Sequence, residues 1–182
     1  LNNANGVLIT SGSYSIKFAL SVSNGILNTN DSLTLLSDSL GTAYISEITG
    51  GGFSGDVRIQ RYLNESSNAF WYMLGSPVIG STLADWNGEV FMGGFPGTNS
   101  TWGPTVYKYD ISAISSGGDY SEGYVAPSHL SNVLNSGDGW IVWVGSSPKI
   151  IDVVGTPRIG NVSVSVPYNT NPAISSQRGW AL

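Results

Sequence analysis

The sequence predicts an all-β protein, in which a short N-terminal β-solenoid-like segment is followed by an antiparallel β-sandwich or jelly roll. Three observations carry this prediction. Glycine (24 residues) and proline (8 residues) interrupt the 182-residue chain every few positions, and no convincing helical pattern lies between them. The intervening runs are short and alternate between apolar and polar residues, with the period of two that strands require. Beyond residue 50 these runs become longer and richer in aromatic residues.

Residues 1–50 are expected to form the solenoid-like segment. Their apolar runs are short and closely spaced, and Asn-Gly, Ser-Gly and Asn-Asp turns separate them. Short, closely spaced apolar runs separated by turns are typical of the stacked coils of a β-solenoid. A meander of ordinary hairpins is the alternative. The expected strands cover residues 7–9, 16–18, 20–22, 26–27 and 33–36.

Residues 51–182 are expected to form the sandwich, in a module truncated at its C-terminal end. Three successive glycines at 50–52 mark the boundary. Long loops rich in glycine and serine cover residues 79–104 and 110–138, and loops on a rigid sheet commonly carry binding residues. The one helical candidate covers residues 127–134. The expected strands cover residues 56–63, 69–74, 90–92, 105–109, 139–144, 149–154 and 161–166.

Composition narrows the classes of function. Charged residues form 10% of the chain, against about 25% in an average soluble domain. Seven basic residues within a net charge of −5 form no basic stripe, which disfavours nucleic acid and anionic membrane surfaces as partners. No cysteine is present for disulfides or thiolate metal sites, and no apolar run approaches the roughly 20 residues of a transmembrane helix. These features favour an extracellular scaffold without membrane insertion.

Catalysis has no clear basis in the sequence. His129 is the only histidine, and the chain has no Gly-x-Ser-x-Gly nucleophile motif. Twelve acidic residues allow so many carboxylate pairs that none of them singles out a glycosidase. The sequence therefore predicts no catalytic residue and no enzyme.

Arg61 is the most sharply defined side chain. Alternation along residues 57–63 places Arg61 on one face with Val57, Ile59 and Leu63. If that face is the core, the guanidinium is buried and must be paired with a carboxylate or with backbone carbonyls. We expect a structural tie between strands or loops, and a ligand-binding arginine is the alternative.

The aromatic residues suggest both core and binding roles. Trp71, Trp140 and Trp143 lie in strand-like runs and are expected in the core. Trp86 and Trp102 lie in the first long loop, where exposed indole rings could stack on sugar rings. Plugging one end of the sandwich is the alternative role for these two loop residues.

Oxygen-bearing side chains gather at two loops. Asp85, Asn87 and Glu89 surround a glycine in the first loop, and Asp119 and Glu122 lie in the second. Calcium favours such ligands, although the spacing falls short of an EF-hand loop. An Asn-Gly turn is the alternative interpretation. No other cofactor and no other metal site is expected.

Several short motifs follow one another along nearly the whole chain. They are the N-terminal Leu-Asn-Asn-Ala-Asn-Gly-Val-Leu-Ile-Thr-Ser-Gly, then Arg61-Tyr62-Leu63, Trp71 with Ser76-Pro77-Val78, Tyr107-Lys108-Tyr109-Asp110, Gly137-Asp138-Gly139-Trp140 and Gly179-Trp180-Ala181-Leu182. This order resembles a module of large secreted proteins of Bacteroidota that the type IX secretion system exports. The last motif is similar to the start of one that continues Val-Gly-Asn-Pro-Tyr, so the resemblance implies a fragment.

The resemblance implies a non-catalytic structural or adhesive module of a bacterial surface or filament protein, and it defines no catalytic residues. The implied partners are the type IX secretion machinery, further domains and other copies of the same protein. A carbohydrate-binding module, or an accessory part of a polysaccharide-degrading enzyme, is the alternative, with glycans as partners.

Two serines match a modification pattern of the same bacteria. Asp31-Ser32-Leu33 and Asp38-Ser39-Leu40 fit the Asp-Ser/Thr-apolar pattern of O-glycosylation in Bacteroidota, which applies if the resemblance holds. Local turn chemistry, in which Asp and Ser bond to nearby backbone, is the alternative for Ser32 and Ser39.

Overall fold

The described part of the protein is built from β-strands and three short 3₁₀ helices. The computed structural model describes residues 1–64, 70–145, 148–166, 168–170, 172 and 179–180, and these residues include no α-helix. The all-β prediction is therefore confirmed, whereas the helical candidate at 127–134 is wrong. No segment in the described ranges forms an apolar helix of membrane-spanning length.

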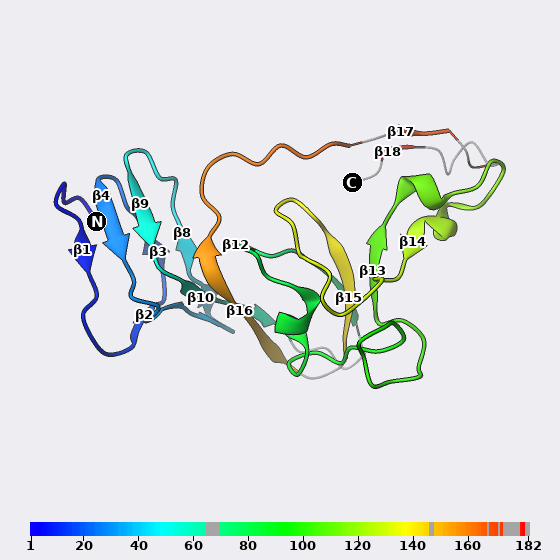
Figure 1. Cartoon of the computed structure of the whole chain (residues 1–182), viewed down its shortest axis with the longest axis horizontal. Coiled ribbons are helices and arrows are strands. Elements are labelled where there is room, and N and C mark those ends of the chain that lie inside the picture. The colour runs from blue at the N-terminus through cyan, green and yellow to red at the C-terminus, as the bar shows by residue number, and fades with distance from the viewer. Residues whose placement is uncertain (65–69, 146–147, 167, 171, 173–178, 181–182) are drawn as a thin grey trace.

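Residues 1–63 make three successive passes, and strands of neighbouring passes pair in parallel (Figure 1). The parallel register shows that these strands do not form a meander of hairpins. One hairpin, of β6 (Ser37–Asp38) and β7 (Gly41–Thr42), interrupts the second pass. The parallel sets are β1 (Val7–Leu8), β4 (Gly25–Asn28) and β9 (Gly51–Ser54); β2 (Tyr14–Ile16), β5 (Leu33–Leu35) and β10 (Val57–Leu63); and β3 (Ala19–Leu20) with β8 (Tyr44–Ile45).

Strand β10 belongs to both halves of the fold. One of its edges pairs in parallel with β5, from Val57↔Leu33 to Ile59↔Leu35. The other edge pairs in antiparallel fashion with β16 (Lys149–Pro157), along the whole length of β10. The resulting sheet has the order β12-β16-β10-β5-β2, with β12 (Val78–Ile79) at one end. Strand pairing therefore continues across the division predicted at residue 50.

A second sheet, of four antiparallel strands, completes the larger part of the molecule. Its order is β11 (Phe70–Leu74), β15 (Trp140–Gly145), β13 (Val106–Tyr109) and β14 (Tyr124–Val125). Predicted strands at 90–92 and 161–166 are absent from the structure, and the other five are confirmed with boundaries shifted by up to three residues. The remaining elements are η1 (Leu83–Trp86), η2 (Ile111–Ala113), η3 (Tyr120–Gly123) and the pair β17 (Tyr168–Asn169) and β18 (Gly179–Trp180).

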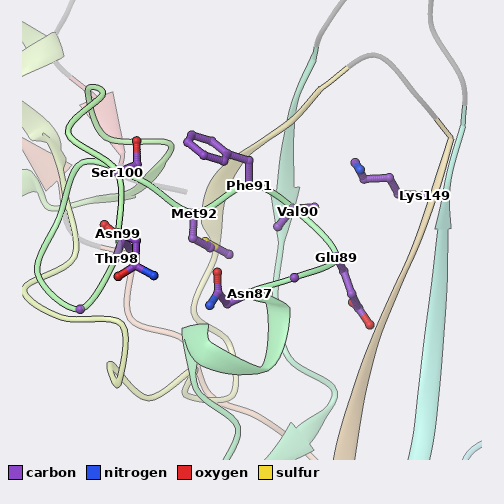
Figure 2. Close-up of a pocket in the computed structure, with 11 residues that line it drawn as sticks. Asn87, Glu89, Val90, Phe91, Met92, Thr98, Asn99, Ser100 and Lys149 are labelled. Atoms are coloured by element: carbon purple, nitrogen blue, oxygen red, sulfur yellow. The ribbon is translucent and has the colours of Figure 1, made fainter.

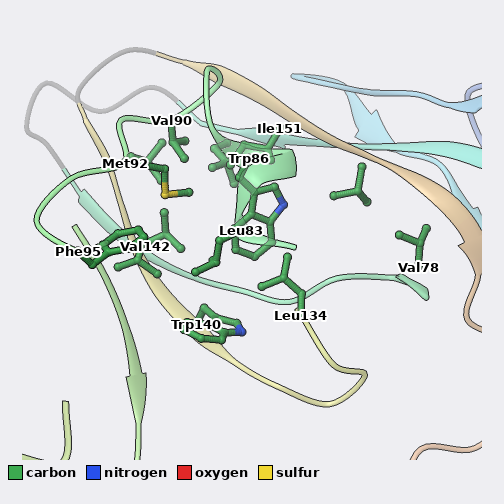
Figure 3. Close-up of a cluster of buried hydrophobic side chains, with 14 residues drawn as sticks. Val78, Leu83, Trp86, Val90, Met92, Phe95, Leu134, Trp140, Val142 and Ile151 are labelled. Carbon is green, nitrogen blue, oxygen red and sulfur yellow. The ribbon is translucent and has the colours of Figure 1, made fainter. Parts of the chain in front are cut away.

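The larger hydrophobic core takes side chains from both sheets and from the first long loop (Figure 3). Alternation produces it, because Trp140, Val142 and Val144 point inward from β15 while the residues between them point outward. The expectation that Trp140 lies in the core is confirmed. The buried members are Leu63, Val78, Leu83, Trp86, Val90, Met92, Phe95, Val106, Leu134, Trp140, Val142, Val144, Ile151 and Val153.

A smaller core lies inside the three parallel passes. Its buried members are Val22, Leu27, Leu33, Leu35, Ala43 and Val57. Leu33 and Val57 occupy paired positions in neighbouring strands, so parallel pairing stacks like residues into ladders that point the same way. Strand β10 contributes to both cores, with Val57 in the smaller one and Leu63 in the larger one.

Candidate functional site

The outer face of the four-stranded sheet carries a group of aromatic side chains, of which Trp71, Phe91 and Tyr124 are exposed. Because Trp140 and Val142 point inward, Ile141 and Trp143 point outward, and their cross-strand partners share that face. The expectation that Trp143 lies in the core is therefore wrong. We refer to this outer surface as the aromatic face. Its side chains are Trp71, Met73, Phe91, Tyr107, Tyr109, Tyr124, Ile141 and Trp143.

Ring contacts hold the aromatic face in a defined arrangement. The Trp71 and Tyr107 ring centroids lie 5.7 Å apart with the planes tilted by 48°. Phe91 meets Trp143 edge-on at 6.3 Å, and Tyr109 meets Tyr124 edge-on at 5.1 Å. These separations fall within the range in which aromatic pairs attract one another. The rings of each pair therefore pack against one another.

Trp71 is 48% exposed, so its expected place in the core is wrong. Strand β11 lies at the edge of its sheet, and Tyr72 and Leu74 take its inward positions against the larger core. Trp71 and Met73 consequently face solvent. All four side chains are apolar or aromatic, so alternation alone did not distinguish the two faces of this strand.

Trp86 is 2% exposed and lies inside the larger core, surrounded by buried side chains (Figure 3). It cannot stack on a sugar, and the prediction of a binding role for Trp86 is wrong. The cause is the η1 turn, in which the Thr82 backbone N–H donates to the Asp85 carboxylate at 2.6 Å and fixes the start of the turn. Leu83 and Trp86, three residues apart in that turn, are both buried.

Trp102 is 78% exposed, as a stacking role requires. It is not part of the aromatic face and makes no ring contact within the described residues. A binding role for Trp102 stays a prediction.

Arg61 is exposed, so its expected burial is wrong. Its guanidinium Nη1 lies 3.5 Å from the hydroxyl of Thr42 in β7, which is a weak tie to the inserted hairpin. The parallel partner β5 ends opposite Ile59, so it does not extend to the position of Arg61. The short ion pair of β10 is made instead by Arg58, whose Nη1 lies 2.6 Å from the Asp152 carboxylate.

The two candidate glycosylation sites differ in exposure. Ser32 is half-buried, and its hydroxyl donates to the Asn30 carbonyl at 2.9 Å, which is the turn chemistry weighed as the alternative. Ser39 is exposed in the turn between β6 and β7, where the Asp38 carboxylate accepts from the Leu40 backbone N–H at 2.8 Å. Modification of Ser32 or Ser39 stays a prediction, and Ser39 is the more accessible of the two.

The candidate calcium ligands bind backbone groups. Glu89 accepts from the Asp152 N–H at 2.8 Å, and Glu122 accepts from the Ser115 N–H at 2.9 Å. Within the described part of the chain, no three His, Asp or Glu side chains come together in a group that could hold a metal. Calcium would therefore have to compete with these hydrogen bonds, and its binding stays a prediction.

A hollow of about 470 Å³ lies beside the first long loop (Figure 2). Asn87, Asn99 and Ser100 give it polar walls, and Phe91 extends it toward the aromatic face. Glu89 also lines it, and burial raises the pKa of Glu89 above its ordinary value of 4.5, with the negative charge of Asp152 adding to the effect. The Glu89 carboxylate holds the loop to the sheet by binding the backbone of β16, whereas the Asp152 carboxylate links β16 to β10 through Arg58.

Two glutamates are expected to titrate on opposite sides of the ordinary value. Burial raises the pKa of Glu89, whereas the N–H and hydroxyl of Ser115 and the Asp119 N–H lower the pKa of Glu122. The Glu122 bonds therefore stabilise the fold above pH 4.5 and are lost as the pH falls through the folded pKa. The pKa shift of Glu89 has the opposite effect on stability, because the stabilisation is present below pH 4.5 and is lost as the pH rises through the raised pKa of the folded state.

Carboxyl-carbon NMR titration checks this order. We expect the Glu89 midpoint above 4.5 and the Glu122 midpoint below it. Ser115→Ala is the matched variant, and it should move the Glu122 midpoint upward while leaving Glu89 unchanged. A Glu122 midpoint above that of Glu89 would contradict the hydrogen-bond assignments.

Comparison with family models, with curated proteins and with solved structures found no match to this chain.

Proposed function

We propose that this chain is a rigid, non-catalytic structural and adhesive module of a secreted bacterial surface or filament protein. The observation that carries the proposal is the double pairing of β10, with β5 on one edge and β16 on the other. A strand hydrogen-bonded on both edges leaves no flexible linker between the parallel passes and the larger part. The passes and the larger part follow one another along the long axis of the molecule, as a spacer requires (Figure 1).

We also propose a fold type for each of the two parts of the molecule. We take residues 1–63 as the coils of a β-solenoid and the two sheets around the larger core as a β-sandwich. Parallel pairing in all three sets of strands supports the solenoid. A core with buried side chains from both sheets, among them Val142 and Val153, supports the sandwich.

Export by the type IX secretion machinery belongs to the same proposal, with further domains or other copies of the protein as partners. The motif resemblance and the charge-poor composition support an extracellular place. Expression of the full gene in a Bacteroidota host is the test of export. We expect the protein outside the cell, and we expect it to accumulate inside a matched strain that lacks the secretion system. Equal export from both strains would contradict this route.

Limited proteolysis of the intact chain tests the structural role. We expect residues 1–63 and the larger part to remain together under native conditions, because cleavage requires local unfolding of paired strands. Early release of a fragment ending near residue 50 would contradict a rigid joint.

Carbohydrate binding is the second candidate function, and the aromatic face is the observation that favours it. Flat exposed rings can pack against the C–H faces of sugars, and Trp71 is the exposed indole of this face. The tyrosines of the face add hydroxyl groups that could bond to sugar oxygens. Tyr107, which lies against Trp71, places one of them next to the exposed indole.

Trp71→Ala is expected to weaken retention on insoluble polysaccharides roughly tenfold, as the loss of one well-placed aromatic contact predicts. Trp102→Ala is the matched control, because its indole is exposed outside the aromatic face. Pull-down on cellulose, chitin and xylan measures both variants. Binding that is lost in the Trp102 variant and retained in the Trp71 variant would assign the site to the loop.

A further inference from the structure

The ladders of the smaller core are exposed only at the first pass. Val7 and Leu27 are paired in parallel and point the same way, yet Val7 is 39% exposed and Leu27 is 7% exposed. Tyr14 and Leu33 form a second such pair, with exposed fractions of 52% and 4%. The two members of each pair differ in their position in the stack, because β4 and β5 of the second pass have a paired strand on both edges, whereas β1 and β2 of the first pass have one on a single edge.

The backbone of the first pass is open on the same side. Within the described residues, β1 and β2 lie at the ends of their sheets, and β3 pairs with β8 alone. Each of these three strands therefore presents a row of unpaired N–H and C=O groups at one end of the stack. Leu8 and Phe18, two exposed residues of the first pass, add apolar surface.

The opposite end of the stack differs. There β10 is covered by β16 along its whole length, so the stack cannot continue at that position. A second copy of this chain that docked head to tail would find one of its three pairing partners occupied. Growth of the stack through all three strands is therefore open at the first pass alone.

We propose that a further β-coil, joined ahead of Leu1 in the same polypeptide, stacks on the first pass and pairs with β1, β2 and β3 together. A single extended peptide could pair with one of these edges, whereas a coil follows all three. The contact continues an interface that already exists between the first and second passes, in the same parallel register. The coil must carry apolar residues over Val7 and Tyr14, because both lie at the exposed end of buried ladders.

The entry point of the chain supports a coil in the same polypeptide. Asn2 forms a parallel bridge with Asn24, and the Ser23 N–H donates to the Leu1 carbonyl at 2.9 Å. Residues 1 and 2 therefore occupy the register in which residues 23 and 24 carry the chain from the first pass to the second. The inference rests on the proposed structural role and deepens it, because it names the first pass as the end that makes the contact and a stacked coil as the segment that covers it.

Tandem duplication of residues 2–23 within the 182-residue chain tests the inference, because the bridge from Asn2 to Asn24 defines these residues as one pass. The added pass should slow hydrogen exchange in the original residues 7–20 by at least about tenfold and raise Tm by at least about 3 °C. The matched control is the same duplication with Val7→Lys and Tyr14→Lys in the added copy, which should give neither effect.

Equal protection in both duplications, or protection in neither, would overturn the inference. Sedimentation of the unduplicated chain tests whether a second copy covers this end instead. Head-to-head dimers in which residues 7–20 are protected from hydrogen exchange would overturn the inference and assign the end to a second copy. These readouts are independent of the joint at β10, so the proposed structural role and the stacking inference can fail separately.

Discussion

Replacing Trp86 with alanine is expected to lower the free energy of unfolding by about 3–5 kcal/mol, the usual cost of removing a fully buried tryptophan. The indole is 2% exposed and fills the space between the η1 turn and the two sheets (Figure 3). Its removal leaves a cavity bounded by side chains that belong to different strands, which restricts collapse. Chemical denaturation monitored by circular dichroism measures the change.

Trp102→Ala is the matched control for that experiment. Both residues lie in the same long loop, but the Trp102 indole is 78% exposed. The control should change the free energy of unfolding by no more than about 0.5 kcal/mol, as is usual at exposed positions. If the two variants lost similar stability, the placement of Trp86 in the core would be wrong.

Replacing Ile59 with proline is expected to destabilise the parallel passes and the larger part together. Ile59 is paired with Leu35 on one side and with Val153 on the other, so a residue without an N–H and with a fixed φ disrupts a central strand. We expect a loss of about 3 kcal/mol or more, comparable to proline inside other regular structure. Hydrogen exchange should rise in both β5 and β16.

Ile79→Pro provides the comparison. Ile79 lies in β12, an edge strand of the same sheet, and its side chain is exposed. Proline is better tolerated at sheet edges, so this variant should be clearly less destabilised. Faster exchange confined to β16 in the Ile59 variant, with β5 unchanged, would contradict the shared role of β10.

Local patterns predicted the strands that carry clear alternation. The runs at 56–63 and 139–144 lie within one residue of β10 and β15. Buried and half-buried residues alternate along β15, and β10 has a buried residue at each end, Val57 and Leu63. The pairing of β10 with β16, far along the chain, depends on the packed structure and has no local signal. The joint on which the proposed function rests was for that reason not predictable from sequence.

The site residues show where alternation stops being informative. Strand β11 has aromatic or apolar side chains on both faces, so the pattern could not tell that Trp71 faces outward. Arg61 has the alternation of a core residue but is exposed at a position beyond the end of β5. Trp86 did have a usable signal, since Leu83 and Trp86 lie three residues apart, as in one 3₁₀ turn with a single buried side.

Differential scanning calorimetry of the intact chain tests the central claim most directly, namely that β10 joins the parallel passes and the larger part into a single rigid body. Pairing along both edges of β10 predicts a single transition, with equal calorimetric and van't Hoff enthalpies. Two separate transitions, the first of which abolishes protection of β4 and β5 while β15 and β16 remain protected from hydrogen exchange, would contradict it.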